Sequence, residues 1–145
     1  MRKKRRMGEA GKSKGGRRVV KVTGTVVSGL GESASFLSIP WVNDQLSKSL
    51  KFSPYCGTLN IKLHNPEIQK VLKTGNGTKV VPAEKGFCEA LVFEGVVAGR
   101  HPCGAILPLV MNYPDDVLEI VAPLHLKQAL GISDGDTIEV ELHVT

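Results

Sequence analysis

Two short stretches of the sequence carry residue types suited to phosphate and magnesium chemistry. Residues 28–32 read Ser-Gly-Leu-Gly-Glu, a turn whose glycines would let backbone N–H groups approach phosphate oxygens closely. Residues 57–60 read Gly-Thr-Leu-Asn and place a hydroxyl (Thr58) and a carboxamide (Asn60) two residues apart, both of them hard oxygen ligands for Mg²⁺. Because the chain has no G-x-x-x-x-G-K-[ST] motif, these stretches suggest nucleotide-phosphate chemistry without a Walker-type loop.

Each of these features also has a simpler interpretation. The glycine-rich turn could merely join two strands, and Thr58 and Asn60 could lie on a solvated strand face. Glu119 lies within the apolar run 117–121, so its carboxylate is either buried beside a partner or on an open face, because an unpaired buried charge is costly. The histidines have no metal-ligand spacing. The three cysteines lack C-x-x-C spacing and cannot all pair within one chain, which favours reduced thiols and a cytoplasmic location.

The composition fits one globular domain preceded by a basic arm. The chain has 145 residues, of which 41% are hydrophobic and 23% charged. About half of the lysines and arginines lie in the first 21 residues, so the net charge of +5 belongs mainly to the arm. We predict that residues 1–17 are disordered, because they are polar and glycine-rich and no apolar signal-peptide segment follows the charges. No run approaches the roughly 20 apolar residues of a membrane span.

The hydrophobic pattern predicts many short strands and few short helices within residues 18–145. Strands are expected over residues 18–28, 35–39, 55–63, 87–98, 104–111, 118–121 and 137–144. Helices are expected over 41–50 and 124–130, with a single helical turn within 65–72. In the strand 55–63, Thr58 and Asn60 would share one face because side chains alternate along a strand. This distribution is typical of a mainly β, barrel-like fold.

Four separated segments, in this order, resemble the archaeal CTP-dependent riboflavin kinases. They are residues 24–32, 52–60, 118–123 and 130–136, and the resemblance extends over residues 20–144. It implies a small cradle-loop barrel of the swapped-hairpin type, with six strands and a few short helices. It also implies a monomeric kinase that transfers the γ-phosphoryl group of CTP to the ribityl 5′-hydroxyl of riboflavin, giving FMN and CDP. The choice of CTP comes entirely from the resemblance.

The resemblance also implies roles for individual residues. Thr58 and Asn60 would bind Mg²⁺, which bridges the phosphates and offsets charge in phosphoryl transfer. Met111 and Glu119 would contact the flavin, and Glu119 is also the candidate general base. The nucleotide would be held by Gly29, Leu30, Gly31, Glu32, Ser33, Ala34, Leu124, His125, Leu126 and Lys127.

The sequence departs from the family pattern mainly on the flavin side. Met111 stands where a hydrogen-bonding threonine is usual, and residues 112–116 lack the basic and histidine character of the family. A second hypothesis is therefore a flavin- or nucleotide-binding homologue without kinase activity. A third is a DNA-binding swapped-hairpin barrel that uses its basic arm. The intact residues 57–60 argue against the third, and the 5% content of aromatic residues argues against a base-stacking platform.

Overall fold

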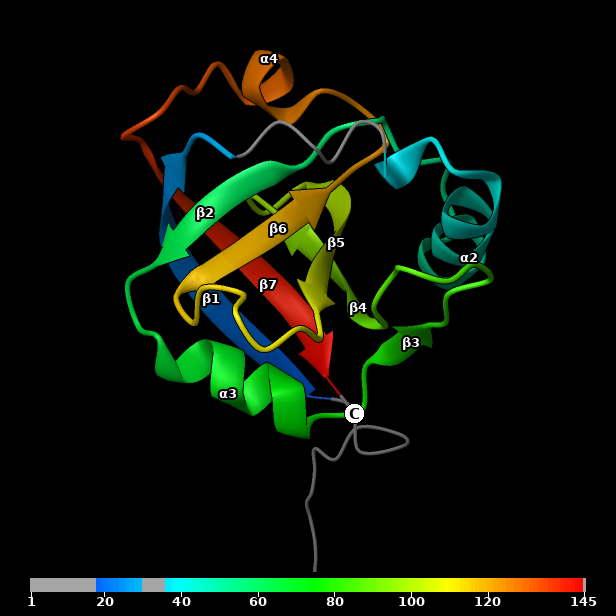
Figure 1. The fold of residues 1–145 in the computed structure, drawn as a ribbon. Helices are drawn as coiled ribbons and strands as arrows, with labels where there is room; N and C mark the ends of the chain where they lie inside the picture. The colour runs from blue at the N-terminus through cyan, green and yellow to red at the C-terminus, as the bar shows by residue number, and fades with distance from the viewer. Residues whose placement is uncertain (1–17, 30–35, 145) are drawn as a thin grey trace, which may run out of the picture.

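The computed structural model describes residues 18–29 and 36–144, which form an antiparallel barrel with helices around it (Figure 1). The elements in chain order are β1 (Arg18–Val27), α2 (Pro40–Leu50), β2 (Leu59–Leu63), α3 (Glu67–Thr74), β3 (Thr78–Val80), β4 (Ala90–Val97), β5 (His101–Pro108), β6 (Val117–Val121), α4 (Leu126–Leu130) and β7 (Thr137–Val144). Residues 1–17, predicted to be a basic arm, lie outside the described residues. Within the described ranges, no helix is long and apolar enough to cross a membrane.

The strands close into a six-stranded barrel, as the sequence predicted. Neighbouring strands follow the order β3-β4-β5-β6-β2-β1-β7, and β7 pairs back onto β4. This last pairing closes the ring β4-β5-β6-β2-β1-β7 and leaves the three-residue β3 as an extra edge strand on β4. The closure is short, because it runs only from the pair Gly95–Leu142 to the pair Val97–Val140. Closing the ring leaves little strand edge open to pairing with another chain.

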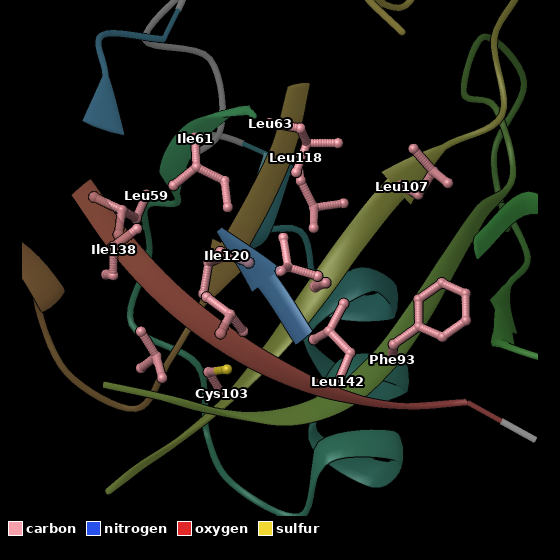
Figure 2. Close-up of a cluster of buried hydrophobic side chains, with 14 of the residues drawn as sticks. Leu59, Ile61, Leu63, Phe93, Cys103, Leu107, Leu118, Ile120, Ile138 and Leu142 are labelled. Carbon is pink, nitrogen blue, oxygen red and sulfur yellow. The ribbon is translucent and has the colours of Figure 1, made fainter. Parts of the chain in front are cut away.

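The barrel interior is filled by one face of each strand (Figure 2). Alternate residues of β2 and β6 point inward and are buried, as the burial pattern of each strand shows. The core includes Leu59, Ile61, Leu63, Phe93, Cys103, Leu107, Leu118, Ile120, Ile138 and Leu142. Burial raises the pKa of the Cys103 thiol to about 12, so this thiol stays protonated and acts as a small apolar group. Each fully buried Leu or Ile contributes about 1.5–3 kcal/mol.

The helix α2 covers part of the outer face of the barrel. It begins with Pro40 at its first position, where a missing N–H costs nothing, and ends at Lys51, which adopts a left-handed φ of 64°. The helix buries Val42, Leu46 and Leu50, which recur every four residues and therefore form one stripe. This stripe packs in a second cluster with outward-facing residues of the barrel, Val80, Ala90, Val92, Ile106 and Val121. The helices α3 and α4 lie near opposite ends of the barrel (Figure 1).

Three local predictions were inaccurate. The predicted strand 35–39 is wrong: Phe36 and Leu37 are helical, and a hydrogen bond from Ile39 N to Phe36 O closes a turn that leads into α2. The strand predicted over 55–63 begins only at Leu59, because the preceding residues form a turn. The strand β3 was not predicted, since three residues are too few to show a pattern. The other predicted elements are present, with ends shifted by up to three residues.

Candidate active site

A cavity of about 820 Å³ lies against the outer face of the barrel, and we call it the large cavity. Its base is a row of residues paired across four strands. Val27 of β1 pairs with Asn60 of β2, and Asn60 pairs with Glu119 of β6. Glu119 pairs in turn with Ile106 of β5. Directly paired residues of antiparallel strands point to the same face, and all four line the large cavity.

This register explains why a carboxylate can stand within the apolar run of β6. The two neighbours of Glu119, Leu118 and Ile120, point into the barrel and are fully buried. Glu119 points the other way, into the large cavity, where it is half-buried. The sequence left open whether this carboxylate is buried beside a partner or lies on an open face. The structure shows something of both, because the carboxylate faces a cavity and also has hydrogen-bond partners.

Both oxygens of the Glu119 carboxylate accept a hydrogen bond. The Thr58 hydroxyl donates to Oε1 over 3.2 Å, and the Tyr113 hydroxyl donates to Oε2 over 2.8 Å. Burial raises the pKa of Tyr113 well above its usual value, and the charge of Glu119 and the hydrogen bond to it add to this shift. The phenol therefore stays neutral and remains a donor. These two hydrogen bonds connect three parts of the structure. Thr58 lies just before β2, Glu119 lies on β6, and Tyr113 lies in the loop between β5 and β6.

The lining of the large cavity divides into a polar group and an apolar wall. The polar group gathers around Glu119 and consists of Ser28, Gly29, Thr58, Asn60 and Tyr113. The apolar wall includes Val27, Phe36, Leu37, Ile39, Phe87, Cys88, Ala90, Ile106, Pro108, Val110, Pro114 and Val117. Within this wall the rings of Phe36 and Phe87 lie 6.2 Å apart, and Trp41 packs edge-on against Phe87. Such a site suits a small molecule that has one apolar part and one polar part.

A second cavity of about 150 Å³, the small cavity, adjoins the first at Thr58, which lines both. The segment predicted to hold the nucleotide, residues 124–127, lines the small cavity together with Tyr55 and Gly57. The His125 ring packs edge-on against Tyr55, with ring centres 5.2 Å apart. The Nδ1 atom of His125 accepts a hydrogen bond from the backbone N–H of Gln128 and so caps α4.

A polar link joins the beginning of the glycine-rich turn to α4. Asp134 lies between the two: it accepts a hydrogen bond from the Ser28 hydroxyl and forms an ion pair with Lys127, whose Nζ lies 2.9 Å from Oδ1. The hydrogen bonds from Ser28 and then from Lys127 lower the pKa of Asp134. The sequence indicated a turn at this position but not that its carboxylate connects two parts of the site.

Gly29 lies directly against Asn60. A Cβ atom at Gly29 would lie 2.2 Å from Nδ2 of Asn60, far inside van der Waals contact. The absence of a side chain at Gly29 therefore makes room for the Asn60 carboxamide, and only this close approach, not a positive φ, requires glycine here.

The structure brings most of the predicted site residues together. Gly29, Thr58, Asn60 and Glu119 line the large cavity, and residues 124–127 line the small one. The predicted loop residues Leu30, Gly31, Glu32, Ser33 and Ala34 lie outside the described residues. Met111 is fully exposed and is not part of the cavity lining, although its neighbour Val110 is.

Sequence reasoning missed Tyr113 and the aromatic residues of the apolar wall. Tyr113 lies in a loop segment that the sequence marked only as a departure from the family. Phe36 and Phe87 come together from segments about 50 residues apart in the chain. No local pattern indicates such a contact, because it depends on how α2 and the loop before β4 pack.

The oxygen donors at the polar group fit a magnesium ion that arrives with phosphates. Among residues 18–29 and 36–144, no group of three or more His, Cys, Asp or Glu side chains is arranged to hold a metal ion. Thr58 and Asn60 contribute two neutral oxygens to the lining of the cavity. Mg²⁺ commonly uses one or two protein ligands together with substrate phosphates and water, so this donor set suits it better than it suits a tightly bound structural metal.

Comparison with known proteins places the chain in a family. The family model of the CTP-dependent riboflavin kinases, described as "Domain of unknown function DUF120", matches residues 26–142. The chain is 30% identical to a riboflavin kinase of Saccharolobus solfataricus and 31% identical to one of Sulfurisphaera tokodaii; these alignments cover 86% and 88% of the chain, and 75% and 98% of the relatives. It is 37% identical to a riboflavin kinase of Methanoculleus marisnigri over 83% of the chain, but this covers only 56% of that longer relative. The family match covers β2 to β6 in full and parts of β1 and β7. Together with these identities, it shows that the chain belongs to the CTP-dependent riboflavin kinase family.

Proposed function

We propose that the protein is a CTP-dependent riboflavin kinase, which transfers the γ-phosphoryl group of CTP to the ribityl 5′-hydroxyl of riboflavin and releases FMN and CDP. The observation that carries this proposal is the position of Thr58, which lines two adjoining cavities of different character. The large cavity suits the molecule that accepts the phosphoryl group, and the small cavity suits the nucleotide that donates it. Phosphoryl transfer requires the two molecules to meet at one point.

Riboflavin fits the large cavity in size and polarity. Its volume of about 820 Å³ lies within the range of roughly 300–1,000 Å³ that is typical for small-molecule sites. The flat isoalloxazine ring would lie in the apolar part, beside Phe36 and Phe87. The ribityl chain would then extend toward Glu119 and present its terminal hydroxyl at the polar group.

The nucleotide would occupy the small cavity, with its phosphates directed toward Thr58 and the turn that begins at Gly29. His125 and Lys127 line this cavity and offer polar contacts to the cytidine nucleotide. Mg²⁺ held by the oxygens of Thr58 and Asn60 would offset the negative charge of the phosphates during transfer. The Thr58 hydroxyl lies beside the Glu119 carboxylate, to which it donates a hydrogen bond over 3.2 Å.

Glu119 is the residue suited to act on the acceptor hydroxyl. Each carboxylate oxygen has a second lone pair beyond the one used by Thr58 or Tyr113. Glu119 can therefore accept a hydrogen bond from the ribityl 5′-hydroxyl, orient its oxygen toward the phosphorus, and take the proton as the new bond forms. Phosphoryl transfer depends mainly on such positioning and on charge stabilisation, so few further groups are needed.

The direct test is an assay with purified protein, riboflavin and Mg²⁺ in parallel reactions with CTP, ATP, GTP and UTP. We expect FMN, identified by chromatography, to form chiefly with CTP. One alternative is a flavin-binding homologue without transfer activity, because Met111 stands where a hydrogen-bonding threonine is usual in the family. That alternative predicts quenching of riboflavin fluorescence but no FMN with any of the four nucleotides, and this result from folded protein would refute the kinase.

The close approach of Gly29 to Asn60 gives a sharper prediction. In Gly29→Ala the new methyl group must displace the Asn60 carboxamide, since its nitrogen lies 2.2 Å from the position of the added Cβ. Because a misplacement of about 1 Å can cost roughly 100-fold in rate, we expect kcat/KM for CTP to fall by about 10- to 100-fold. Steady-state kinetics at varied CTP measures this change.

The double variant shows whether the effect runs through Asn60. If the methyl group acts by displacing the carboxamide, Gly29→Ala should add little to the loss already caused by Asn60→Ala. An unchanged kcat/KM in Gly29→Ala would mean that the Asn60 position is not needed for turnover.

A further inference from the structure

We propose that Tyr113 is a positioning residue of this active site, which holds the Glu119 carboxylate in the orientation required for transfer. The inference rests on the proposed function, because it concerns how the candidate base is placed. Tyr113 itself lines the large cavity, and its hydroxyl lies 2.8 Å from Oε2 of Glu119.

Two donors fix the carboxylate from opposite sides. With Thr58 on Oε1 and Tyr113 on Oε2, rotation of the carboxylate about its last bond would break both hydrogen bonds. Without the Tyr113 hydroxyl, one oxygen would lose its protein donor and the carboxylate could rotate. Hydrogen bonds to charged groups are stronger than those between neutral groups, so Tyr113 can hold Glu119 firmly.

The loop that carries Tyr113 is anchored at its base, although its tip is exposed. Leu109, Val110 and Met111 are exposed, whereas Gln69 of α3 is only 1% exposed. The side-chain amide of Gln69 donates to the carbonyl oxygens of Pro114 and Val117, both over 2.8 Å. These bonds flank the start of β6 and hold the backbone immediately after Tyr113. On the other side, the backbone N–H of Tyr113 donates to the carbonyl oxygen of Val110 over 3.4 Å, so the residue is held from both directions along the loop.

Tyr113 keeps its proton in this environment, which makes it a dependable donor. Burial is the main reason that its pKa lies above the usual value, and the negative charge of Glu119 acts in the same direction.

The test is a double-mutant cycle with Tyr113→Phe and Glu119→Gln, measured as FMN formation from riboflavin and CTP. Tyr113→Phe keeps the ring and removes only the hydroxyl, so we expect kcat to fall by about 10-fold while KM for CTP stays within about twofold. In the Glu119→Gln background, the same change should lower kcat by less than about twofold, because the group that Tyr113 holds is already altered. The control is Asp115→Asn, an exposed residue of the same loop outside the cavity lining, which should leave kcat unchanged.

A full 10-fold loss in both backgrounds, or no loss in either, would overturn the inference. If the wild-type protein forms no FMN, the proposed function fails, and the same four proteins are then compared by urea denaturation. We expect Tyr113→Phe to shift the urea concentration at the midpoint of unfolding in the wild-type background but not in the Glu119→Gln background. This result would show that Tyr113 acts through Glu119. A shift that is equal in both backgrounds would refute the coupling independently of the enzyme activity.

Discussion

Replacing Asn60 with alanine is expected to lower kcat/KM for FMN formation by roughly 100- to 1,000-fold. Asn60 lies at the centre of the row that forms the base of the large cavity, between Val27 and Glu119. Its carboxamide supplies one of the two oxygens proposed to hold Mg²⁺ on the phosphates. Removing this oxygen should destabilise the transition state more than the bound substrates, because the charge that the metal ion offsets is greatest in the transition state.

Two comparisons separate metal binding from general damage to the site. Asn60→Asp keeps an oxygen ligand of the same size, so we expect it to retain much more activity than Asn60→Ala, with a changed dependence on Mg²⁺ concentration. Lys62→Gln alters an exposed residue two positions along the same strand and should leave kcat/KM within about twofold. Titration of activity with MgCl₂ measures all three variants. Equal Mg²⁺ dependence in the wild type and in a partly active Asn60→Ala would contradict the role of this residue as a metal ligand.

Replacing Gly95 with alanine is expected to destabilise the fold by about 3 kcal/mol, the upper part of the range for overpacked sites. A Cβ atom at Gly95 would lie 2.3 Å from the backbone oxygen of Glu141 and 2.8 Å from a methyl carbon of Leu142. A backbone atom cannot move aside as the end of a side chain can. The added methyl group must therefore separate β4 from β7 where three residue pairs close the barrel.

Urea denaturation followed by the fluorescence of Trp41 measures this change in the free energy of unfolding. Glu94→Ala, at the half-exposed neighbouring position, is the matched control and should change stability by less than about 0.5 kcal/mol. If Gly95→Ala were as stable as this control, the close contact between β4 and β7 would not limit the fold.

The sequence was sufficient to predict the barrel, because its strands carry strong local signals. In β7, the alternation of buried and exposed residues from Thr137 to Val144 is regular, and the turn before it contains Gly135 and Asp136. The helix α2 was likewise indicated by the spacing of Val42, Leu46 and Leu50. The segment 35–39 failed because five residues with alternating hydrophobicity fit a helical turn as well as a strand, and packing against the barrel decides between them.

The site was only partly predictable, for a different reason. Thr58, Asn60 and Glu119 could be named from local motifs and resemblance, and the structure places them on one cavity. Tyr113 could not be named, because its partnership with Glu119 depends on a loop whose base is held by Gln69, a residue about 45 positions earlier. Met111 was named from the resemblance to the family, but its side chain is fully exposed and lies outside the cavity lining.

The position of the site on the outer face of the barrel has a consequence for how this protein can change. Within β6, Leu118 and Ile120 serve the core, while Val117 and Glu119 line the large cavity. Residues that fill the core and residues that line the large cavity therefore alternate from Val117 to Ile120 of the same strand. A library that varies Val117 and Pro108 while keeping the inward-facing residues could shift the preferred flavin analogue without repacking the interior.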